Sequence, residues 1–251
     1  MFYMILTNSQ KNRQIIQQYI VIYNILKYNR IMVIMYENTE NMGLQQVMIG
    51  AIKDQKTIDY YNTHAKDFAQ STTDLDFHEV QDRFLTKLPL GARILDFGCG
   101  AGRDAKYFAE KGFEVVATDG SEELCNIANQ FTGVVAKRMF FSELDETESY
   151  DGIWACASIL HLRKEEIMDV IPRMIRAVKT DGYLYMSFKY GTFEGYRGER
   201  YFTNFTEKSF EEFIEPFSNV TIMEKWISSD VRPGRGEEKW LNLILQKRTI
   251  N

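Results

Sequence analysis

The sequence predicts an α/β protein built on a mostly parallel sheet. The apolar run 93–97 ends in a glycine-rich turn and continues into a helix that begins near Arg103. A second apolar run, 113–118, ends at Asp119. A strand, a helix and a second strand in this order form a βαβ unit, whose two strands are parallel. Further strand-length apolar runs at 134–141, 151–156 and 183–189 extend the same alternation of strand and helix.

Helical patterns separate these strands. Helices are expected at 57–68, 82–88, 103–108, 121–130, 165–178 and 205–214. Ser121 is followed by two glutamates, which is typical of a capped helix start. Pro172 lies in the middle of 165–178 and predicts a kink or a break there. The last two strands, 220–227 and 240–246, are expected to pair antiparallel.

The turn after the first strand carries glycines at alternate positions, Gly98, Gly100 and Gly102. Glycine lets the backbone turn tightly and approach a ligand closely, and the N–H groups that open the next helix point at that ligand. A glycine trio alone is a weak signal. Asp96 at the end of the strand, and Asp119 about twenty residues later, strengthen it because an acid after the second strand meets a ribose. The loop therefore predicts a nucleotide-cofactor site.

Residues 95–102, 117–121 and 150–154 together resemble the class I S-adenosylmethionine-dependent methyltransferases, and the resemblance covers roughly residues 57–247. A nicotinamide enzyme is the competing interpretation of the glycine loop. The acid two residues before the first glycine favours the methyltransferase. The resemblance implies a doubly wound, mostly parallel seven-stranded sheet with an antiparallel C-terminal edge hairpin. It also implies S-adenosylmethionine as the cofactor.

The resemblance assigns the cofactor contacts. Asp96 and the glycine loop would hold the methionine end, and Asp119 the ribose hydroxyls. Tyr61 lies on a helix that covers the cofactor in the family, or is an ordinary core aromatic. Arg103 would lie near the cofactor's α-carboxylate, or pair with a neighbouring acid. The expected contacts are Tyr61, Asp96, Gly98, Cys99, Gly100, Gly102, Arg103, Asp119, Gly120, Ser121, Phe140, Phe141, Cys156 and Ala157.

One position departs from the family pattern. Many relatives carry an acid at the end of the third strand, which accepts the adenine amino group. This chain has Phe140, Phe141 and Ser142 there instead. Adenine recognition would then depend on stacking, apolar contact and backbone groups, and the residue that recognises the base stays open.

The methyl acceptor is expected at the carboxyl ends of the later strands, where doubly wound sheets bind ligands. Ser158 and His161 follow one such strand, and Lys189 ends the next. These three are the candidate catalytic residues. His161 is either a general base or acceptor-orienting group, or a structural histidine beside a helix start.

Two connections project at the same edge. Residues 190–204, rich in aromatics and glycine, are interpreted as a substrate loop, with an ordinary surface loop as the alternative. In the connection 228–239, Arg232 and Arg235 would clamp an anionic acceptor, or would neutralise the nearby acids. The expected acceptor contacts are Tyr196, Arg197, Arg200, Tyr201, Arg232 and Arg235.

Composition indicates one catalytic domain, residues 51–251, in a chain of 251 residues. The net charge of −5 gives no global basic field of the kind that nucleic-acid binders carry. Cys99, Cys125 and Cys156 are an odd number without metal-ligand spacing, so we expect no metal and a reducing, cytoplasmic setting. We expect a monomer or homodimer without a membrane span.

Residues 1–50 form an N-terminal extension that differs in composition from the rest. Tyr19, Ile20 and Tyr23 belong to an apolar set at near-helical spacing that also includes Ile15, Ile16 and Leu26, which predicts an amphipathic helix. Three explanations are open: a start assigned too far upstream, an added helix that packs on the domain or a partner, or a weak organelle presequence.

The expected reaction is methyl transfer to a small-molecule acceptor, because the segments added to the family's common fold are short and the net charge of the chain is negative. The first alternative is a tRNA or other nucleic-acid methyltransferase that uses Arg197, Arg200, Arg232 and Arg235 as a local phosphate contact. The second is a catalytically silent, cofactor-binding scaffold subunit.

Overall fold

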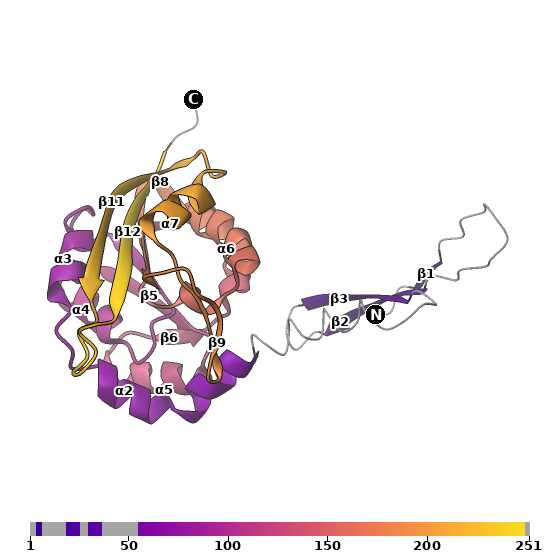
Figure 1. Ribbon diagram of the computed structural model, residues 1–251, viewed down its shortest axis with the longest axis horizontal. Coiled ribbons are helices and arrows are strands. Elements are labelled where there is room, and N and C mark those ends of the chain that lie inside the picture. Colours follow the sequence, from indigo (N-terminus) through magenta and orange to yellow (C-terminus); the bar gives the residue numbers. More distant parts are fainter. Residues whose placement is uncertain (1–3, 7–18, 26–29, 37–54, 249–251) are drawn as a thin grey trace. The chain divides into compact units, whose positions relative to one another are not determined.

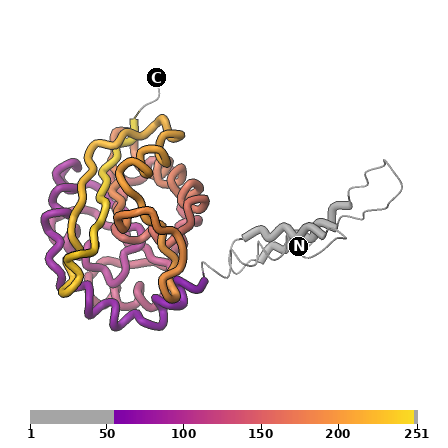
Figure 2. The backbone as a smooth tube through the Cα atoms, in the orientation of Figure 1, coloured from indigo at the N-terminus to yellow at the C-terminus, as the bar shows by residue number. Residues whose placement is uncertain are grey.

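The computed structural model describes residues 4–6, 19–25, 30–36 and 55–248 (Figure 2). The chain divides into two compact units, Met1–Gln55 and Lys56–Asn251. In the first unit, β1 (Met4–Leu6), β2 (Tyr19–Ile25) and β3 (Arg30–Tyr36) form an antiparallel sheet in the order β1-β2-β3.

The helix predicted through this unit is therefore wrong for Tyr19–Ile25, and the positions Ile15, Ile16 and Leu26 lie outside the described residues. The segment is rich in tyrosine, isoleucine and valine, which favour strands because branched and aromatic side chains fit a pleated surface. The proposals of an upstream start and of a presequence stay predictions.

The second unit is organised around a seven-stranded sheet in the order β11-β12-β8-β7-β4-β5-β6 (Figure 1). Strands β4 to β8 are parallel where they pair, and β12 runs antiparallel to both β8 and β11. This confirms the doubly wound sheet with an antiparallel C-terminal hairpin. The strands are β4 (Arg93–Phe97), β5 (Glu114–Asp119), β6 (Ala136–Arg138), β7 (Tyr150–Ala155), β8 (Val178–Lys189), β11 (Val220–Ser229) and β12 (Lys239–Lys247).

Helices cover both faces of this sheet. Residues 55–63 are helical. The other helices are α2 (Ala65–Thr72), α3 (His78–Leu85), α4 (Arg103–Glu110), α5 (Glu122–Phe131), α6 (Lys164–Ala177) and α7 (Glu207–Ile214), with short 3₁₀ turns at Phe141–Glu143 and Ile159–His161. The hydroxyl of Ser121 caps α5 by accepting from the N–H of Leu124. Helix α6 continues through Pro172, so the predicted break is absent.

Alternation along the strands separates two apolar layers. On β7, Ile153 faces the layer that contains α6 and α7, whereas Trp154 faces the layer that contains α3 and α4. Leu184 and Tyr185 on β8 divide in the same way. This arrangement buries both faces of the parallel strands, as a parallel sheet requires.

Two segments differ from their predicted form. The predicted third strand shortens to β6, and Phe141 begins a 3₁₀ turn instead. The predicted substrate loop is a hairpin of β9 (Glu194–Arg197) and β10 (Arg200–Thr203), because Gly198 adopts φ +63° and turns the chain between them.

Within the described residues, we find no helix of the length and apolar character needed to cross a membrane.

Candidate active site

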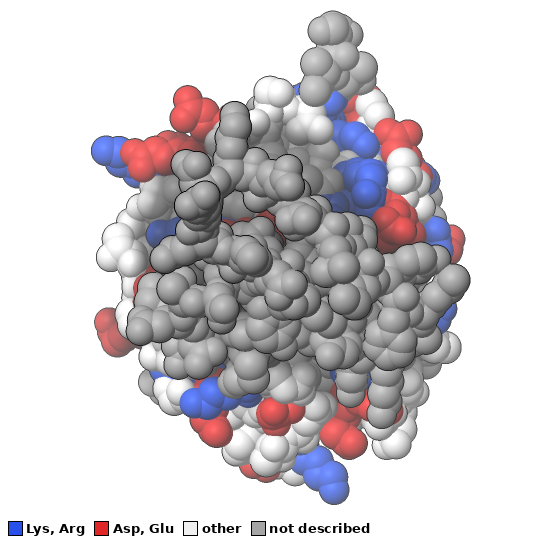
Figure 3. Space-filling view, turned by 90° about the vertical axis from the view of Figure 1, so that its right-hand side faces the viewer, with Lys and Arg blue, Asp and Glu red and all other residues white. Residues whose placement is uncertain are grey.

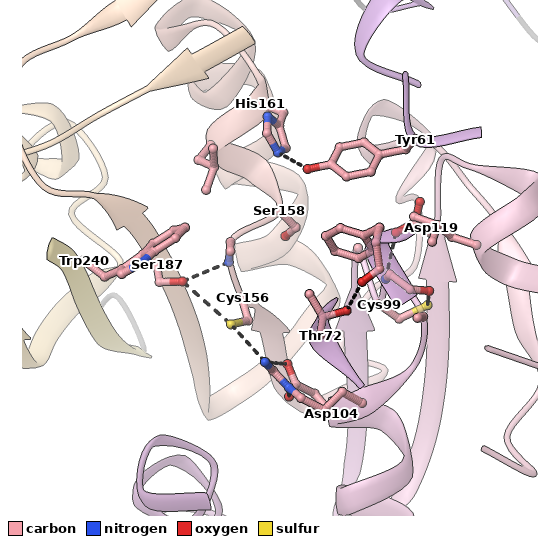
Figure 4. Close-up of a pocket in the computed structure, with 18 of the residues that line it drawn as sticks. Tyr61, Thr72, Cys99, Asp104, Asp119, Cys156, Ser158, His161, Ser187 and Trp240 are labelled. Atoms are coloured by element: carbon pink, nitrogen blue, oxygen red, sulfur yellow. Dashed lines mark hydrogen bonds and ion pairs between the residues drawn. The ribbon is translucent and has the colours of Figure 1, made fainter. Parts of the chain in front are cut away.

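A cavity of about 230 Å³ opens at the carboxyl ends of the parallel strands. The order of the sheet reverses between β4 and β7, and doubly wound sheets bind ligands at that point. Figure 4 shows the cavity between Asp119 and Trp240, with Tyr61 and His161 pointing toward each other at its edge. Segments from both ends of the domain therefore meet in one space.

The glycine loop forms one wall of the cavity. The N–H groups of Gly98 and Cys99 both donate to the carbonyl oxygen of Thr118 at 2.8 Å, which ties the loop to β5. Gly98 has φ +91°, and a Cβ there would collide with the side chain of Ser158. A Cβ on Gly100 would lie 3.0 Å from the ring of Phe68. The absence of these side chains keeps the cavity open.

The third glycine of the trio has a different position. Gly102 does not line the cavity, and a Cβ there would collide with Thr132 and crowd Ala128 on α5. It also adopts φ +92° as the residue before α4. Gly102 therefore allows α4 and α5 to pack closely.

Asp119 lies at the end of β5 with both carboxylate oxygens bonded to the backbone. Oδ2 accepts from the N–H of Gly100 at 2.9 Å, and Oδ1 accepts from the N–H of Ser121 at 2.8 Å. Burial raises the pKa of Asp119, and these N–H groups oppose the rise. The bonds fix the orientation of a carboxylate that lines the cavity.

Asp96 lies directly before the glycine loop and behind the cavity wall. Its side chain is buried, and Oδ2 has no hydrogen-bond partner among the described residues. Burial raises the pKa of Asp96 well above its ordinary value, the carboxylate of Asp104 adds to the rise, and Arg103 opposes it. A cation in this region would lower that pKa again.

Arg103 lines the cavity but has a partner in the chain. Its Nε and Nη2 donate to the two oxygens of Asp104 at 2.7 and 3.0 Å, and its guanidinium lies 4.5 Å from the ring centroid of Phe77. Asp104 also accepts from the indole N–H of Trp154 at 2.8 Å. Of the two alternatives for Arg103, the structure therefore shows the pair with Asp104.

His161 is held by two hydrogen bonds that define its tautomer. Nδ1 lies 2.7 Å from the carbonyl oxygen of Tyr201, which only accepts, so Nδ1 carries the proton. Nε2 therefore accepts from the hydroxyl of Tyr61 at 2.8 Å. Burial lowers the pKa of His161 to about 4, while the bond to Tyr201 opposes the fall and the charges of Arg200 and Lys189 add to it. The ring is neutral at physiological pH.

The backbone near His161 is strained. Ala157, two residues after the end of β7, has φ +49°, which non-glycine residues rarely adopt. Its N–H donates to Ser187 on the adjacent strand at 2.9 Å, and the hydroxyl of Ser158 donates to the carbonyl of Phe97 at 2.7 Å. These bonds tie the ends of β4, β7 and β8 together. The hydroxyl proton of Ser158 is therefore engaged in a structural hydrogen bond to the backbone.

The far wall of the cavity carries charged pairs. Lys189, at the end of β8, is ion-paired with Glu238. Arg232 forms a fork-shaped pair with the buried carboxylate of Asp230, whose Oδ2 also accepts from the indole N–H of Trp240 at 3.1 Å. Burial alone would raise the pKa of Asp230, but the bonds from Arg232 and Trp240 bring it to about 2.

The cavity collects most but not all of the predicted site residues. The predicted residues that line it are Tyr61, Gly98, Cys99, Gly100, Arg103, Asp119, Gly120, Phe140, Phe141, Cys156, Ala157, Ser158, His161, Lys189, Arg200, Arg232 and Arg235. Those outside its lining are Asp96, Gly102, Ser121, Tyr196, Arg197 and Tyr201. All three cysteines are free thiols.

Two of the predicted residues outside the lining, Tyr201 and Ser121, form hydrogen bonds with residues that line the cavity or belong to the helix beside it. The backbone N–H of Tyr201 donates to the hydroxyl of Thr57 at 3.2 Å, and its carbonyl orients His161. Ser121 donates to Asn62 at 2.7 Å while it caps α5. Both bonds hold the helix of residues 55–63 over the cavity.

Sequence reasoning missed several lining residues. They are mostly apolar or lie on strands and helices whose register only the fold defines: Ile58, Phe68, Asp104, Leu124, Ser187, Phe202, Asp230, Trp240 and Asn242. The position of Asp104, directly after Arg103 at the start of a helix beside the glycine loop, was a signal that it could line the cavity. Trp240 had a weaker signal, as an aromatic at the start of a strand that leaves the active edge.

Comparison with known proteins gives a consistent result. Residues 94–182 match the family described as "Methyltransferase domain". The chain is 31% identical over 128 residues to the protein named "Putative methyltransferase YqeM" of Bacillus subtilis; the match spans 47% of this chain and 52% of YqeM. It is 35% identical over 99 residues to sarcosine/dimethylglycine N-methyltransferase of Aphanothece halophytica, over 36% of each protein. The chain thus spans about half the length, or less, of these curated relatives.

A solved structure extends the likeness to the whole fold. The 1,6-didemethyltoxoflavin-N1-methyltransferase of Burkholderia thailandensis, crystallised with 1,6-didemethyltoxoflavin and S-adenosylhomocysteine, has a TM-score of 0.61 at 18% identity. The match covers 95% of this chain and 99% of that one. The family match and the fold are thus similar to those of the class I S-adenosylmethionine-dependent methyltransferases.

Proposed function

We propose that this protein transfers the methyl group of S-adenosylmethionine to a small-molecule acceptor. The observation that carries the proposal is the continuity of one cavity, from Gly98, Gly100 and Asp119 on one side to His161 and Lys189 on the other. A donor held at the first set and an acceptor held at the second would lie in the same enclosed space.

The cofactor side of the cavity fits S-adenosylmethionine in three respects. The glycine cradle leaves room that a Cβ would fill. Asp119 is oriented by two backbone bonds and would accept from ribose hydroxyls. Asp96 lies behind the lining with one oxygen unpartnered among the described residues, and from there its charge would attract the cofactor's α-ammonium group. Apolar side chains line the rest of this side, where adenine would lie: Ile58, Leu124, Met139, Phe140 and Phe141.

S-adenosylmethionine supplies an already activated methyl group, so alignment of the acceptor contributes much of the acceleration. Thr57, Ile58 and Tyr61 of the helix of residues 55–63 line the cavity and would limit the access of water to the reacting groups. His161 presents a neutral imidazole whose Nε2 is occupied by the hydroxyl of Tyr61. It would orient the acceptor through that hydroxyl, and would accept a proton at Nε2 only after Tyr61 moves.

The two alternative functions are a nucleic-acid methyltransferase and a catalytically silent scaffold subunit, and they require different side chains on the acceptor side of the cavity. A nucleic-acid acceptor would need a group of unpaired cations, yet two of the four arginines assigned to it, Arg232 and Arg235, face Asp230 and Glu238. Around the rim of the face seen in Figure 3, basic and acidic side chains lie next to one another. These observations favour the small molecule. The tRNA and scaffold proposals stay as alternatives for the experiment.

Calorimetric titration with S-adenosylmethionine and S-adenosylhomocysteine tests the cofactor. We expect micromolar binding that Asp119→Ala weakens about 10- to 100-fold, because hydrogen bonds to a charged group contribute about 1.5–3 kcal/mol. Asp169→Ala, on the exposed side of α6, is the control. No binding to folded protein would exclude the methyltransferase function.

A second measurement separates the acceptor classes. Methyl-labelled S-adenosylmethionine is incubated with the protein and either a low-molecular-weight metabolite pool or total tRNA. Label in the metabolite fraction supports the proposal, and label in tRNA alone would reverse it. Cofactor binding without label in either pool would favour the silent scaffold.

A further inference from the structure

Five cationic side chains line the cavity: Arg103, Lys189, Arg200, Arg232 and Arg235. Four of them have a carboxylate partner in the chain. Arg103 pairs with Asp104, Lys189 with Glu238, Arg232 with Asp230, and Arg235 more loosely with Glu238 at 3.8 Å. Among the described residues, no carboxylate lies within ion-pair distance of Arg200.

Arg200 is nevertheless held in place. Its guanidinium carbon lies 4.6 Å from the ring centroid of Tyr60 and 5.3 Å from that of Phe202. Nη1 donates a long hydrogen bond of 3.4 Å to the hydroxyl of Tyr61. Aromatic rings contact a guanidinium through its faces, whereas carboxylates bind its edge through paired N–H groups. The stacking therefore orients the group and leaves most of its edge unused.

We propose that the methyl acceptor carries a carboxylate group and that Arg200 binds it through this free edge. The inference rests on the proposed function, and it names the acceptor's chemical class. A partly buried arginine without a counterion, as Arg200 is among the described residues, is costly, and an anionic ligand would relieve that cost. The hydroxyl of Tyr61 then lies between the carboxylate site and Nε2 of His161.

The surrounding charges favour a single negative charge over a phosphate. Asp230 also lines the cavity, and Lys189 and Arg232 already compensate Glu238 and Asp230. Among the described lining residues, a doubly charged group would find one cation without an ion pair, in the same cavity as the carboxylate of Asp230. A carboxylate matches the planar edge of one guanidinium in both shape and charge.

The test uses the protein saturated with S-adenosylhomocysteine and titrated with 2-aminobenzoate, phenylacetate and N-methylglycine, each beside its primary amide. We expect at least one acid to bind ten or more times as tightly as its amide. Arg200→Met should abolish that preference and leave S-adenosylhomocysteine binding unchanged. Arg200→Lys keeps the charge without the fork and should retain part of the preference.

Arg83→Met is the matched control, since Arg83 is also stacked on an aromatic ring, that of Trp226, but lies outside the cavity. The inference fails if no acid is preferred over its amide, if the preference persists in Arg200→Met, or if phenyl phosphate binds more tightly than every carboxylate. A large loss of S-adenosylhomocysteine affinity in Arg200→Met would assign Arg200 to the cofactor instead. Failure of S-adenosylhomocysteine to bind the wild-type protein would overturn the proposed function itself.

Discussion

The hydroxyl group of Tyr61 donates to Nε2 of His161 at 2.8 Å, although the two residues lie 100 positions apart in the chain. The same hydroxyl accepts from Arg200 at 3.4 Å. One phenol thus joins the helix of residues 55–63, the 3₁₀ turn Ile159–His161 that follows β7, and the hairpin of β9 and β10. The covering of the cavity and the state of its histidine are therefore linked.

Tyr61→Phe should separate this bond from the packing of the ring. The ring keeps its edge contact with Phe68, at a centroid distance of 5.2 Å, while the bond to His161 is lost. We expect the free energy of unfolding to fall by about 1 kcal/mol, and the affinity for S-adenosylhomocysteine to fall with it. Tyr107→Phe, which removes a hydroxyl bonded to Asp82 on the surface, should leave that affinity unchanged. Equal affinities in the two variants would contradict the link.

Stability should depend on pH through His161. Its pKa is about 4 in the folded protein and 6.5 for an ordinary histidine. As the pH falls below 6.5, the unfolded chain binds a proton before the folded protein does. The stabilisation is therefore complete above pH 6.5 and is lost between pH 6.5 and about 4, up to about 3 kcal/mol. Urea unfolding at pH 7 and 5.5 should show a smaller pH effect in His161→Gln than in the wild type.

Nuclear magnetic resonance gives a direct check on the same group. The chain has three histidines, and the imidazole signal that disappears in His161→Gln is that of His161. We expect that signal to keep the shift of a neutral imidazole, protonated at Nδ1, down to about pH 4. A midpoint near 6.5 would disprove the buried, neutral state.

Gly98→Ala should affect both folding and cofactor binding. The substitution combines a positive φ with a collision against Ser158, and we expect a loss of about 3 kcal/mol in unfolding free energy and no measurable S-adenosylhomocysteine binding. Gly112→Ala is the control: Gly112 has φ +87°, but a Cβ there meets nothing within 4 Å. Its cost should be about 1 kcal/mol, with binding intact. If Gly98→Ala and Gly112→Ala changed S-adenosylhomocysteine binding and the free energy of unfolding equally, backbone strain alone would explain the need for glycine at position 98.

Ser121→Ala should loosen the covering helix as well as α5. Ser121 caps α5 and donates to Asn62, whereas Thr206 caps α7 away from the cavity. Each alanine variant should cost about 1 kcal/mol of stability. Only Ser121→Ala should also speed hydrogen exchange in residues 55–63. The same exchange rate in Ser121→Ala and Thr206→Ala would show that the bond to Asn62 does not hold the helix.

The local patterns of the sequence were sufficient for the central part of the fold. Strand β4, the glycine turn and α4 follow each other without interruption, so hydrophobic period and glycine position locate them together. The N-terminal unit shows the limit of the same method. The apolar spacing of Tyr19–Ile25 fits a helix and a strand alike, and strand pairing with Arg30–Tyr36 decides between them.

Some residues of the candidate site could be predicted from the sequence, and others could be recognised only in the folded structure. Asp119 and the glycines were predictable because their roles depend on short spacing along the chain. The pairing of Arg232 with Asp230 was one of two alternatives, and local sequence could not choose. Arg197 and Arg200 are alike in sequence and are direct partners across the hairpin, yet only Arg200 lines the cavity.

The sequence by itself therefore determined the cofactor loop and the alternation of strand and helix, since both depend on the conformation and burial of neighbouring residues. The tertiary structure decided which distant side chains meet. It joins Tyr61 to His161, and it brings Arg200 to the cavity, away from every carboxylate of the described residues. Charge neutralisation and proton location depend on distances between segments far apart in the chain. Those distances are set only when the sheet and its connections have packed.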